Sequence, residues 1–476
     1  MLRATPPQRG MDEGYEGFLC MKLRVVLAIA ACKFIRFALR AMGRGGTALP
    51  GKVAVMICPD LLKRLAKDVE CSVITGTNGK TTSARMLEQF YIDSGASYFS
   101  NKSGSNLMQG ITAEFALLAT AGGKPKCRHA IIECDEGASK KVFEYLDPKL
   151  VLVTNVFRDQ LDRFADVGAA LDSIKIGVKN SPNAIVCLNA DDPLISSIAD
   201  DIPNKVVLFG VDPGVFDNNP DGLPDAPNCV HCDEKYEYSY TTYGHMGGFR
   251  CPSCGRTRQR PDVAVTGLTA QDADSLSVAL RAYGDTAGIT INLPGMYNVY
   301  NSAGAIAAAL ELGFPIEAAK AAMLRFECGF GRMEKFDLGG LPVRMILVKN
   351  QVGCDLALDY LLSLSGDALF VICLNDRIAD GADVSWIEDV RFEKLLEMAD
   401  RLRGVFVSGT RAGDMALRLG RAGLPEGLVQ VFGDMGQLLD ALLNQDTPVC
   451  IIPTYTAMLE LRGIIGRRFG LKNFWE

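Results

Sequence analysis

Three features that the sequence lacks narrow its function before any motif is considered. The 476 residues carry a formal net charge of −6 with an isoelectric point near 5.4, so the chain lacks the basic excess of a nucleic-acid-binding surface. We therefore expect no nucleic-acid partner. The apolar run at residues 25–32 is too short to span a bilayer and is followed directly by Lys33. No internal repeat is present, which excludes a repeat architecture.

Apolar residues and cysteines, by contrast, are plentiful. A hydrophobic content of 48% predicts well-filled cores, and the length allows two or three domains. Most of the 15 cysteines stand singly in apolar runs, as Cys187 and Cys373 do, where cysteine packs as a small hydrophobe. This usage is typical of a reducing compartment, so we expect a cytoplasmic protein.

Short β-branched runs alternate with longer helical stretches from about residue 50, a pattern that predicts an α/β fold with a mostly parallel sheet. The strand-like runs cover residues 72–75, 130–133, 150–155 and 184–189. Ligands of such folds bind beyond the carboxyl ends of the strands. The residues that end or follow these runs, and that we expect to border one crevice, are Gly76, Glu133, Asn155 and Asn189.

Four segments are expected along the chain. Residues 1–50 form an N-terminal arm, 51–335 an ATP-binding domain with an Ala-rich helix near 295–312, 222–260 an insertion within that domain, and 336–476 a second α/β domain. The arm has Met11 and Met21 as alternative starts, and its basic, apolar residues 22–44 allow two interpretations. They form either an amphipathic helix packed on the catalytic domain or a helix resting on anionic lipid at the inner membrane face.

The most informative segment lies between residues 73 and 82, where a glycine turn follows an apolar run and opens a helical one. Backbone N–H groups there can face a triphosphate, Lys80 supplies a positive charge, and Thr81 supplies a hydroxyl for Mg²⁺. Ile74 stands where the common phosphate-loop pattern has glycine, so an incidental glycine-rich turn is the alternative. The predicted ATP-binding residues are Gly76, Thr77, Asn78, Gly79, Lys80, Thr81 and Thr82.

Acidic residues follow a second predicted strand. Glu133 stands at the end of this strand. A cation that bridges phosphate oxygens requires oxygen ligands, so we expect Glu133 to bind Mg²⁺ together with Thr81. Asp135 and Glu136 either share or orient this role; a solvated acidic loop is the alternative.

Two cysteine pairs predict a metal site. Cys229-x-x-Cys232 and Cys251-x-x-Cys254 are separated by eighteen residues, the spacing of a zinc ribbon with four thiolate ligands. Because four sulfurs close the coordination shell, the Zn²⁺ is expected to be structural, and His231 and His245 are expected at the surface. A redox pair is the competing interpretation.

The loop Thr-Gly-Thr-Asn-Gly-Lys-Thr-Thr at residues 75–82 resembles that of Mur ligases and folylpolyglutamate synthases, which activate a carboxylate as an acyl phosphate. Residues 153–163 are similar to the Mur motif in which Asp-His-Leu-Asp follows Thr-Asn, although Gln160 replaces the histidine and leaves a second metal position in doubt. The resemblance implies that Asn298 contacts adenine and that Arg332 contacts phosphate.

Within this group the chain resembles the MurT family, the synthetase subunits of lipid II isoglutaminyl synthase. The resemblance rests on the Leu-Pro-Gly-Lys lead-in at 49–52, the inserted cysteine pairs, the Asp-Gln-Leu-Asp variant at 159–162, a different C-terminal region, and only about seventy residues before the loop. It implies a heterodimer with the glutamine amidotransferase GatD. It also implies ATP- and Mg²⁺-dependent amidation of the D-glutamate α-carboxyl of lipid II in peptidoglycan synthesis.

The C-terminal region holds a further expected site. Residues 375–386 resemble the MurT segment from which an aspartate completes the Cys-His pair of GatD, an orienting task that suits a fixed carboxylate. Asp376 is the first choice, Asp380 and Asp383 stay open, and an acidic helix cap is the alternative. The nearby loop 348–353 has Gln351 where the family has proline, so its backbone is less constrained.

Two other functions compete with amidation. A folylpolyglutamate-synthase-like ligase would add an amino acid without any amidotransferase partner, and a zinc-ribbon adaptor would bind nucleotide without turnover. The sequence contains no Gly-x-Cys-x-Gly nucleophile elbow, and His129 has no evident cysteine partner, so ammonia for an amidation would have to come from elsewhere.

Overall fold

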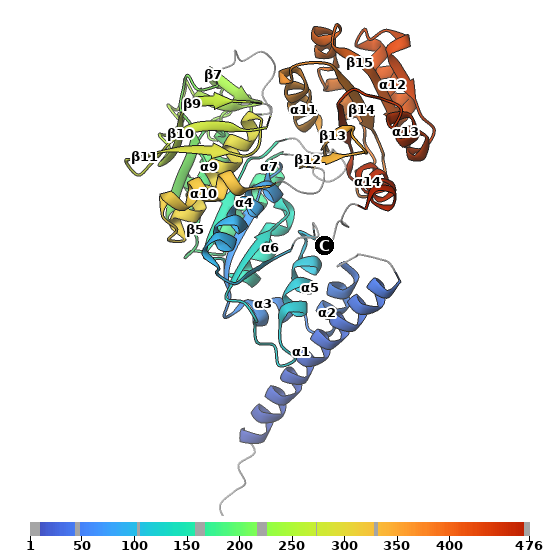
Figure 1. The fold of residues 1–476 in the computed structure, drawn as a ribbon. Coiled ribbons are helices and arrows are strands. Elements are labelled where there is room, and N and C mark those ends of the chain that lie inside the picture. The colour runs from blue at the N-terminus through green and yellow to red at the C-terminus, as the bar shows by residue number, and fades with distance from the viewer. Residues whose placement is uncertain are drawn as a thin grey trace, which may run out of the picture.

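The computed structural model describes residues 10–42, 48–101, 105–157, 167–216, 226–272, 274–327 and 332–470, with side chains from residue 21 onward except that of Arg332. Two open sheets and a short hairpin organise this part of the chain (Figure 1). Both larger sheets are mostly parallel and flanked by helices, which confirms the predicted α/β class. Among the described residues, no helix is long and apolar enough to cross a membrane.

The first sheet has nine strands in the order β11-β10-β9-β6-β5-β4-β1-β3-β2. Strands β1 to β6 and β9 run parallel, and β10 and β11 extend the sheet in antiparallel fashion. The four predicted strand runs fall on β1, β3, β4 and β5. The strands are β1 (Glu70–Thr75), β2 (Tyr98–Ser100), β3 (His129–Glu133), β4 (Leu150–Val153), β5 (Ile185–Asn189), β6 (Val206–Val211), β9 (Val263–Gln271), β10 (Leu276–Ala282) and β11 (Asp285–Ile291).

Helices cover both faces of this sheet. Ile74 and Leu152 share a core with α4 and α9, whereas Val73 and Val153 share the opposite core with α6 and α7. Because both faces are buried, the strands are continuous apolar runs in the sequence instead of alternating ones. The helices are α4 (Lys80–Ser94), α5 (Met108–Leu118), α6 (Glu136–Leu146), α7 (Val167–Lys179), α9 (Met296–Glu311) and α10 (Ile316–Arg325).

Helix α9 is the Ala-rich helix expected near residues 295–312. It packs so closely on the sheet that a Cβ added to Gly304 would lie 3.1 Å from side-chain atoms of Leu152 and Phe209. Small residues are therefore required on this face of the helix. The close packing brings the N-terminal turn of α9, which carries Asn298, to the carboxyl edge of the sheet.

The second sheet has the strand order β12-β13-β17-β14-β15-β16. All its neighbours pair in parallel except β12, which pairs antiparallel with β13. The expected domain boundary at residues 335 and 336 therefore falls inside β12; the division into domains stays a prediction. The elements are β12 (Arg332–Asp337), β13 (Pro342–Ile346), α11 (Gln351–Ser363), β14 (Ala368–Cys373), β15 (Leu402–Ser408), α12 (Ala412–Arg421), β16 (Val429–Val431), α13 (Met435–Leu442), β17 (Val449–Pro453) and α14 (Tyr455–Phe469).

A separate two-stranded hairpin lies within the expected insertion at residues 222–260. Its strands are β7 (Glu237–Tyr243) and β8 (Met246–Arg250), which pair antiparallel with irregular register. Short helical segments complete the chain at α8 (Pro193–Ser196), η1 (Ser197–Asp201), η2 (Ser385–Asp389), η3 (Phe392–Met398) and η4 (Glu426–Leu428).

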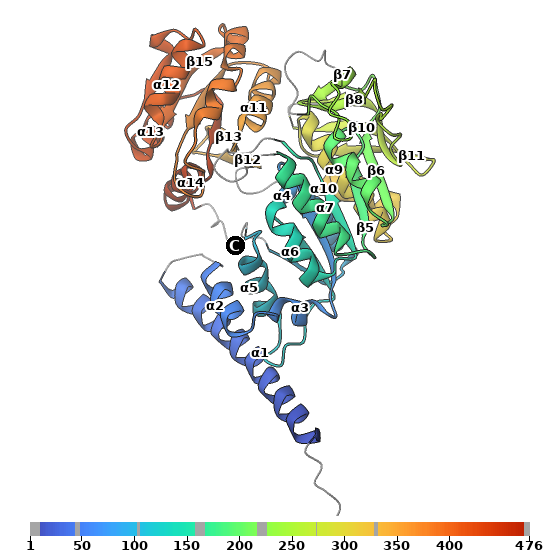
Figure 2. The same ribbon diagram turned by 180° about the vertical axis from the view of Figure 1, so that it is seen from behind.

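Among the described residues, three helices precede β1, at the end of the molecule away from the second sheet (Figures 1 and 2). They are α1 (Gly10–Ala41), α2 (Ala48–Ile57) and α3 (Leu61–Ala66). Helix α2 packs on α5, and the contact is close at Gly51, where an added Cβ would lie only 1.7 Å from the Gln109 carbonyl oxygen. The Leu-Pro-Gly-Lys lead-in thus places its glycine where no larger residue fits.

We predict that Gly51→Ala lowers stability by about 1–3 kcal/mol, because α2 must move away from α5 to admit the methyl group. Thermal unfolding of the purified chain measures this effect. Gly122→Ala is the matched control, since no heavy atom lies within 4 Å of an added Cβ there. Equal melting temperatures for the two variants would contradict the role assigned to Gly51.

Candidate active site

The loop between β1 and α4 is held by two glycines with left-handed backbone. Gly76 has φ 124° and Gly79 has φ 84°, values that L side chains rarely adopt. A Cβ on Gly76 would lie 2.3 Å from Thr154 Oγ1, and one on Gly79 would lie 2.1 Å from Asn301 Oδ1. The loop is therefore pressed between the end of β4 and the first turns of α9.

The end of β4 fixes the loop by hydrogen bonds. The Thr77 N–H donates to the Asn155 carbonyl oxygen (2.8 Å), and the Asn78 N–H donates to Asn155 Oδ1 (2.9 Å). Thr154 Oγ1 in turn donates to the Asn78 carbonyl oxygen (2.7 Å). The predicted pair of Thr154 and Asn155 is thus the support of the loop. Asn189 is fully buried one strand further and donates to the Thr154 carbonyl oxygen (3.4 Å).

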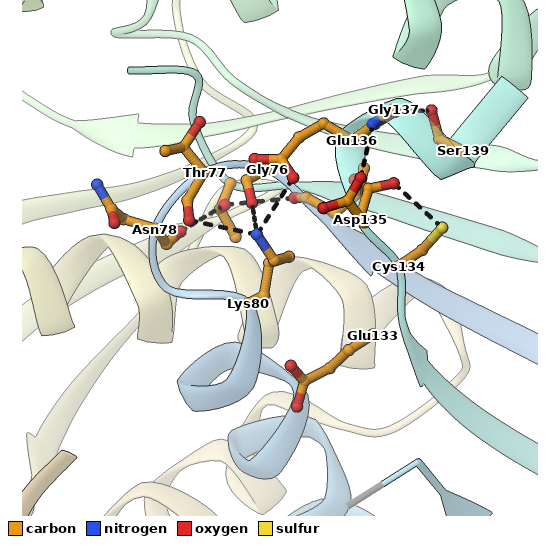
Figure 3. Close-up of polar contacts among 12 residues, drawn as sticks. Gly76, Thr77, Asn78, Lys80, Glu133, Cys134, Asp135, Glu136, Gly137 and Ser139 are labelled. Atoms are coloured by element: carbon orange, nitrogen blue, oxygen red, sulfur yellow. Dashed lines mark hydrogen bonds and ion pairs between the residues drawn. The ribbon is translucent and has the colours of Figure 1, made fainter. Parts of the chain in front are cut away.

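Lys80 opens α4 and its side chain folds back over the loop. Its ammonium group donates to the carbonyl oxygens of Gly76 and Thr77, the latter at 3.2 Å, and pairs with Glu136 Oε2 at 3.4 Å. Figure 3 shows the amine turned toward this cluster, with the Glu133 carboxylate apart from it beside α4. Only 11% of the Lys80 side chain is exposed, so its charge acts in a largely dry setting.

Glu133 and Thr81, the pair expected at Mg²⁺, lie in direct contact. Thr81 Oγ1 donates to Glu133 Oε2 at 2.7 Å, and Glu133 is 8% exposed. Asn101 fixes the end of β3, because its side chain accepts from the Glu133 N–H (2.9 Å) and donates to the Glu133 carbonyl oxygen (2.8 Å). Hydroxyl and carboxylate oxygens together are a donor set that suits Mg²⁺.

The two neighbouring carboxylates have different environments. Asp135 caps α6 by accepting the Gly137 N–H at 3.0 Å; burial and then the nearby Glu136 charge raise its pKa, although Lys80 opposes the shift. The Glu136 carboxylate faces the Lys80 ammonium group and not the Glu133 carboxylate. In this arrangement Glu136 orients the lysine, and Asp135 shapes the helix that carries Glu136.

A pocket of about 100 Å³ lies next to the loop, between the first sheet and the second. Asn78, Gly79 and Thr82 come from the loop and α4, and Asn298 comes from α9. The other lining residues are Asn155, Tyr243, Tyr297, Asn301, Met333, Ile346, Leu347, Gly353 and Leu356. Residues from four distant parts of the chain therefore enclose one cavity.

Several of these lining residues were not predicted from the sequence. Asn301 stands three residues after Asn298 on the same helical face and donates to its Oδ1 at 3.2 Å, a spacing that could have revealed it. Tyr243 reaches the pocket from the hairpin and stacks on Phe157 with ring centroids 5.7 Å apart. No local sequence signal marks Tyr243, because its position depends on where the hairpin folds back.

The second sheet contributes the loop before α11. Asn350 caps α11 by accepting the Gly353 N–H (2.9 Å), and its Nδ2 approaches Asn78 Oδ1 at 3.4 Å. Gln351, which replaces the family's proline, donates to the Asp389 carbonyl oxygen at 2.9 Å. This loop thus connects the second sheet directly to the loop between β1 and α4.

Two expected features lie outside the described residues. The Asp-Gln-Leu-Asp segment at 159–162 is one of them, and the Arg332 side chain is the other. The backbone of Arg332 opens β12 next to Met333, which lines the pocket and has a positive φ of 61°. Such a backbone conformation is costly for methionine and is typical of functional sites.

The three candidate aspartates of the C-terminal region differ in their contacts. Asp376 follows β14 and is partly exposed; hydrogen bonds from Thr410, at 2.8 Å, and from Arg411 lower its pKa. Asp380 is 4% exposed and caps α14, accepting the Thr456 N–H at 2.7 Å. Asp383 caps η2 by accepting the Ser385 N–H at 2.8 Å, which lowers its pKa.

The four expected metal ligands lie close together. The sulfur atoms of Cys229, Cys232, Cys251 and Cys254 all lie within 4.8 Å of one another. The closest pairs are 3.5 and 3.6 Å apart, near the roughly 3.8 Å expected around a tetrahedral Zn²⁺ with bonds of about 2.3 Å. Burial opposes ionisation of Cys229, but backbone N–H groups of the knuckle lower its pKa to about 6. The donor set therefore fits Zn²⁺.

One histidine prediction was wrong. His231 is at the surface, paired with Asp200 Oδ2 at 3.0 Å, as expected. His245, however, is fully buried, with Nε2 3.2 Å from Asp192 Oδ1 and its ring 4.8 Å from that of Phe157. The reason is that the hairpin turn carrying His245 points away from the cysteines and into the core.

Comparison with known proteins agrees with this geometry. Residues 347–458 match the family described as MurT ligase C-terminal, and residues 74–226 match the Mur ligase middle domain. The lipid II isoglutaminyl synthase (glutamine-hydrolyzing) subunit MurT of Streptococcus pneumoniae is 32% identical over 455 residues, which cover 94% of this chain and 98% of that protein. The chain belongs to the MurT family. The MurT protein of Staphylococcus aureus is 30% identical, with 94% and 99% of the two chains covered.

Solved structures support the same fold. MurF from Acinetobacter baumannii is similar with a TM-score of 0.63 and 16% identity, covering 88% of this chain and 81% of its own. A pseudomurein peptide ligase type C from Methanothermus fervidus gives a TM-score of 0.61 at 19% identity, with 85% and 80% covered. The MurT family is thus a ligase family with the Mur ligase fold, and its two named relatives are each one subunit of a synthase.

The cysteine cluster and the pocket are joined by one hairpin, which leads to a prediction. Cys232→Ser should reduce bound zinc from about one ion per chain to a small fraction, because three sulfurs cannot close the tetrahedron. Nucleotide affinity should fall about tenfold, since β7 carries Tyr243 into the pocket. Metal analysis and nucleotide titration measure the two effects.

The control for this experiment is Cys127→Ser, which removes a thiol outside the cluster and should change neither quantity. Loss of zinc with unchanged nucleotide affinity would show that the contact of His245 with Asp192 is enough to hold the hairpin turn in place.

Proposed function

We propose that this chain is the ATP-dependent synthetase subunit that amidates the D-glutamate α-carboxyl of lipid II, with ammonia delivered by a GatD-like glutamine amidotransferase. The observation that carries the proposal is the joint placement of Lys80, Thr81 and Glu133 beside a pocket that both sheets enclose. The names of the MurT relatives support the substrate and the glutamine-hydrolysing partner.

ATP occupies the pocket in this proposal. The N-terminus of α4 presents the N–H groups of its first turn to the phosphates, whereas the Thr77 and Asn78 N–H groups stay bound to Asn155. Lys80 exchanges its contact with Glu136 for phosphate oxygens and neutralises charge that develops during transfer. Asn298, with Asn301 beside it, and the rings of Tyr243 and Tyr297 offer polar and aromatic contacts to the base. We assign phosphate contact to Arg332 from the family resemblance.

Thr81 and Glu133 hold Mg²⁺ in this scheme, and the ion when bound neutralises the phosphate oxygens. A substrate carboxylate oxygen attacks the γ-phosphorus, the bond to the bridging oxygen breaks, and ADP leaves. Ammonia then attacks the carbonyl carbon of the acyl phosphate, loses a proton, and phosphate departs. The loop at Asn350 lies beside Asn78, so it is positioned to close on the reacting carboxylate.

The ammonia source is a partner chain. The sequence has no nucleophile elbow of its own, and its relatives are named as subunits. Among the three candidate aspartates, Asp376 fits best as the group that orients a partner histidine, because it is ionised, partly exposed and fixed by Thr410 and Arg411. Asp380 is occupied as the cap of α14. The Zn²⁺ role is structural, and the reaction belongs in the cytoplasm at the inner membrane face.

Replacing Lys80 tests the phosphoryl-transfer step. Lys80→Ala should lower ATP-dependent formation of the amide by about a hundredfold or more, because a preorganised charge at the transferring group is lost. The product is measured by mass spectrometry of lipid II after incubation with Mg²⁺-ATP and ammonium. Lys179→Ala, an exposed lysine at the end of α7, is the control. Retained activity in Lys80→Ala would overturn the site assignment.

Replacing Asp376 separates the synthetase from the partner. Asp376→Asn should keep amidation with ammonium and lose it with glutamine and GatD, because only glutamine hydrolysis needs the carboxylate. Asp383→Asn should keep both activities. A selective loss in Asp383→Asn would instead transfer the assignment to that residue. ATP-dependent coupling of an amino acid to the carboxyl group, without a partner or ammonia, would favour an amino-acid-adding ligase.

A further inference from the structure

Helix α1 has two apolar faces, and only one of them packs on the protein. Ala28, Ile29 and Cys32 are buried against the neighbouring helices. The opposite side consists of residues spaced by three and four, which form a continuous stripe on a helix. We call this stripe the outer α1 face; its members are Leu23, Val26, Leu27, Ala30, Phe34 and Phe37.

The outer α1 face is unusually exposed for its composition. Phe34 and Phe37 are 71% and 72% exposed, and Leu23 and Leu27 are 58% and 51% exposed. Two phenylalanines one turn apart with most of their surface in water are costly on a soluble helix, at about 25 cal/mol for each square ångström left unburied. Ile92 and Leu324, two other large exposed apolar residues, stand on separate helices, and Leu49 and Met56 are the pair exposed on α2. We therefore expect the outer α1 face to be buried against a binding partner.

The charged residues around this face indicate which kind of partner binds it. Residues 17–59 contain no aspartate or glutamate, in a chain whose net charge is −6. Exposed Lys22 and Arg40 lie along one side of the stripe, and exposed Arg24 lies along the other. The basic residues of this stretch are Lys22, Arg24, Lys33, Arg36, Arg40, Arg44 and Lys52.

Two of these basic side chains point toward the rest of the protein and not toward solvent. Lys33 Nζ donates to the Ala119 carbonyl oxygen at 2.6 Å, at the end of α5, and Arg36 is 7% exposed. They hold α1 in the orientation that turns its second apolar face outward. The remaining exposed cations border that face, an arrangement typical of helices that lie in the interface of an anionic bilayer.

We infer that residues 21–41 of α1 dock flat on the anionic lipid of a membrane, with the outer α1 face in the acyl boundary and Lys22, Arg24 and Arg40 at the headgroups. The helix cannot cross the bilayer, because no described helix is long and apolar enough. A second copy of the chain fits this face poorly, since two such faces would bring their basic borders together. The inference goes beyond the proposed reaction and does not require it.

Vesicle flotation of the purified full-length chain tests this docking. The chain should bind phosphatidylglycerol vesicles on the order of tenfold or more tightly than phosphatidylcholine vesicles, and added salt should weaken the binding. Phe34→Glu with Phe37→Glu should abolish it, because two charges would enter the acyl boundary. The triple variant Lys22→Gln, Arg24→Gln and Arg40→Gln should lose the preference for anionic lipid. Unlike the glutamate variant, it places no charge in the acyl boundary.

The matched control is Ile176→Glu with Leu324→Glu, two exposed apolar residues of α7 and α10, which should leave vesicle binding unchanged. Circular dichroism establishes that all variants are folded. Equal binding to both lipids, no binding, or a lipid-free dimer that Phe34→Glu disrupts would each overturn the inference. Because vesicle binding needs no turnover, such a failure is separate from a failure of the proposed amidation.

Discussion

The phosphate loop depends on a steric fit that leaves no space at two glycines. Gly76 lies against the Thr154 side chain, and Gly79 lies against Asn301, so β4 and α9 define the path of the loop from both sides. Hydrogen bonds that the Thr77 and Asn78 N–H groups donate to Asn155 then fix the backbone between them. The direction of the Lys80 side chain and the position of the Thr81 hydroxyl both follow from this path, as does the mouth of the pocket. The rest of the site is arranged around this constraint.

The charged side chains inside the site each have a polar or oppositely charged partner. Lys80 has a carboxylate partner in Glu136, and Glu133 has a hydroxyl partner in Thr81, so neither charge is buried alone. Asp135 contributes as a helix cap. Three acidic residues within four positions thus have three separate tasks, which are set by the turn between β3 and α6.

Much of this arrangement could be predicted from the sequence, because it depends on local patterns. The strand ends, the glycine loop and the cysteine spacing each involve a few consecutive residues, and the α/β order follows from apolar runs buried on both faces. Tyr243 and Leu347 could not be found in this way, since they reach the pocket from a hairpin and from the second sheet. His245 was misplaced for the same reason: its nearness to the cysteines in sequence says nothing about the direction of the hairpin turn.

The pocket is built from both sheets, with Asn78 and Asn298 on one side and Met333, Leu347 and Gly353 on the other. A ligand that touches both sides would hold the two sheets together at the pocket. Its binding free energy therefore adds to the cohesion of the whole chain, by an amount that grows with the logarithm of ligand concentration. A nucleotide bound in this pocket would therefore also stabilise the contact between the two sheets.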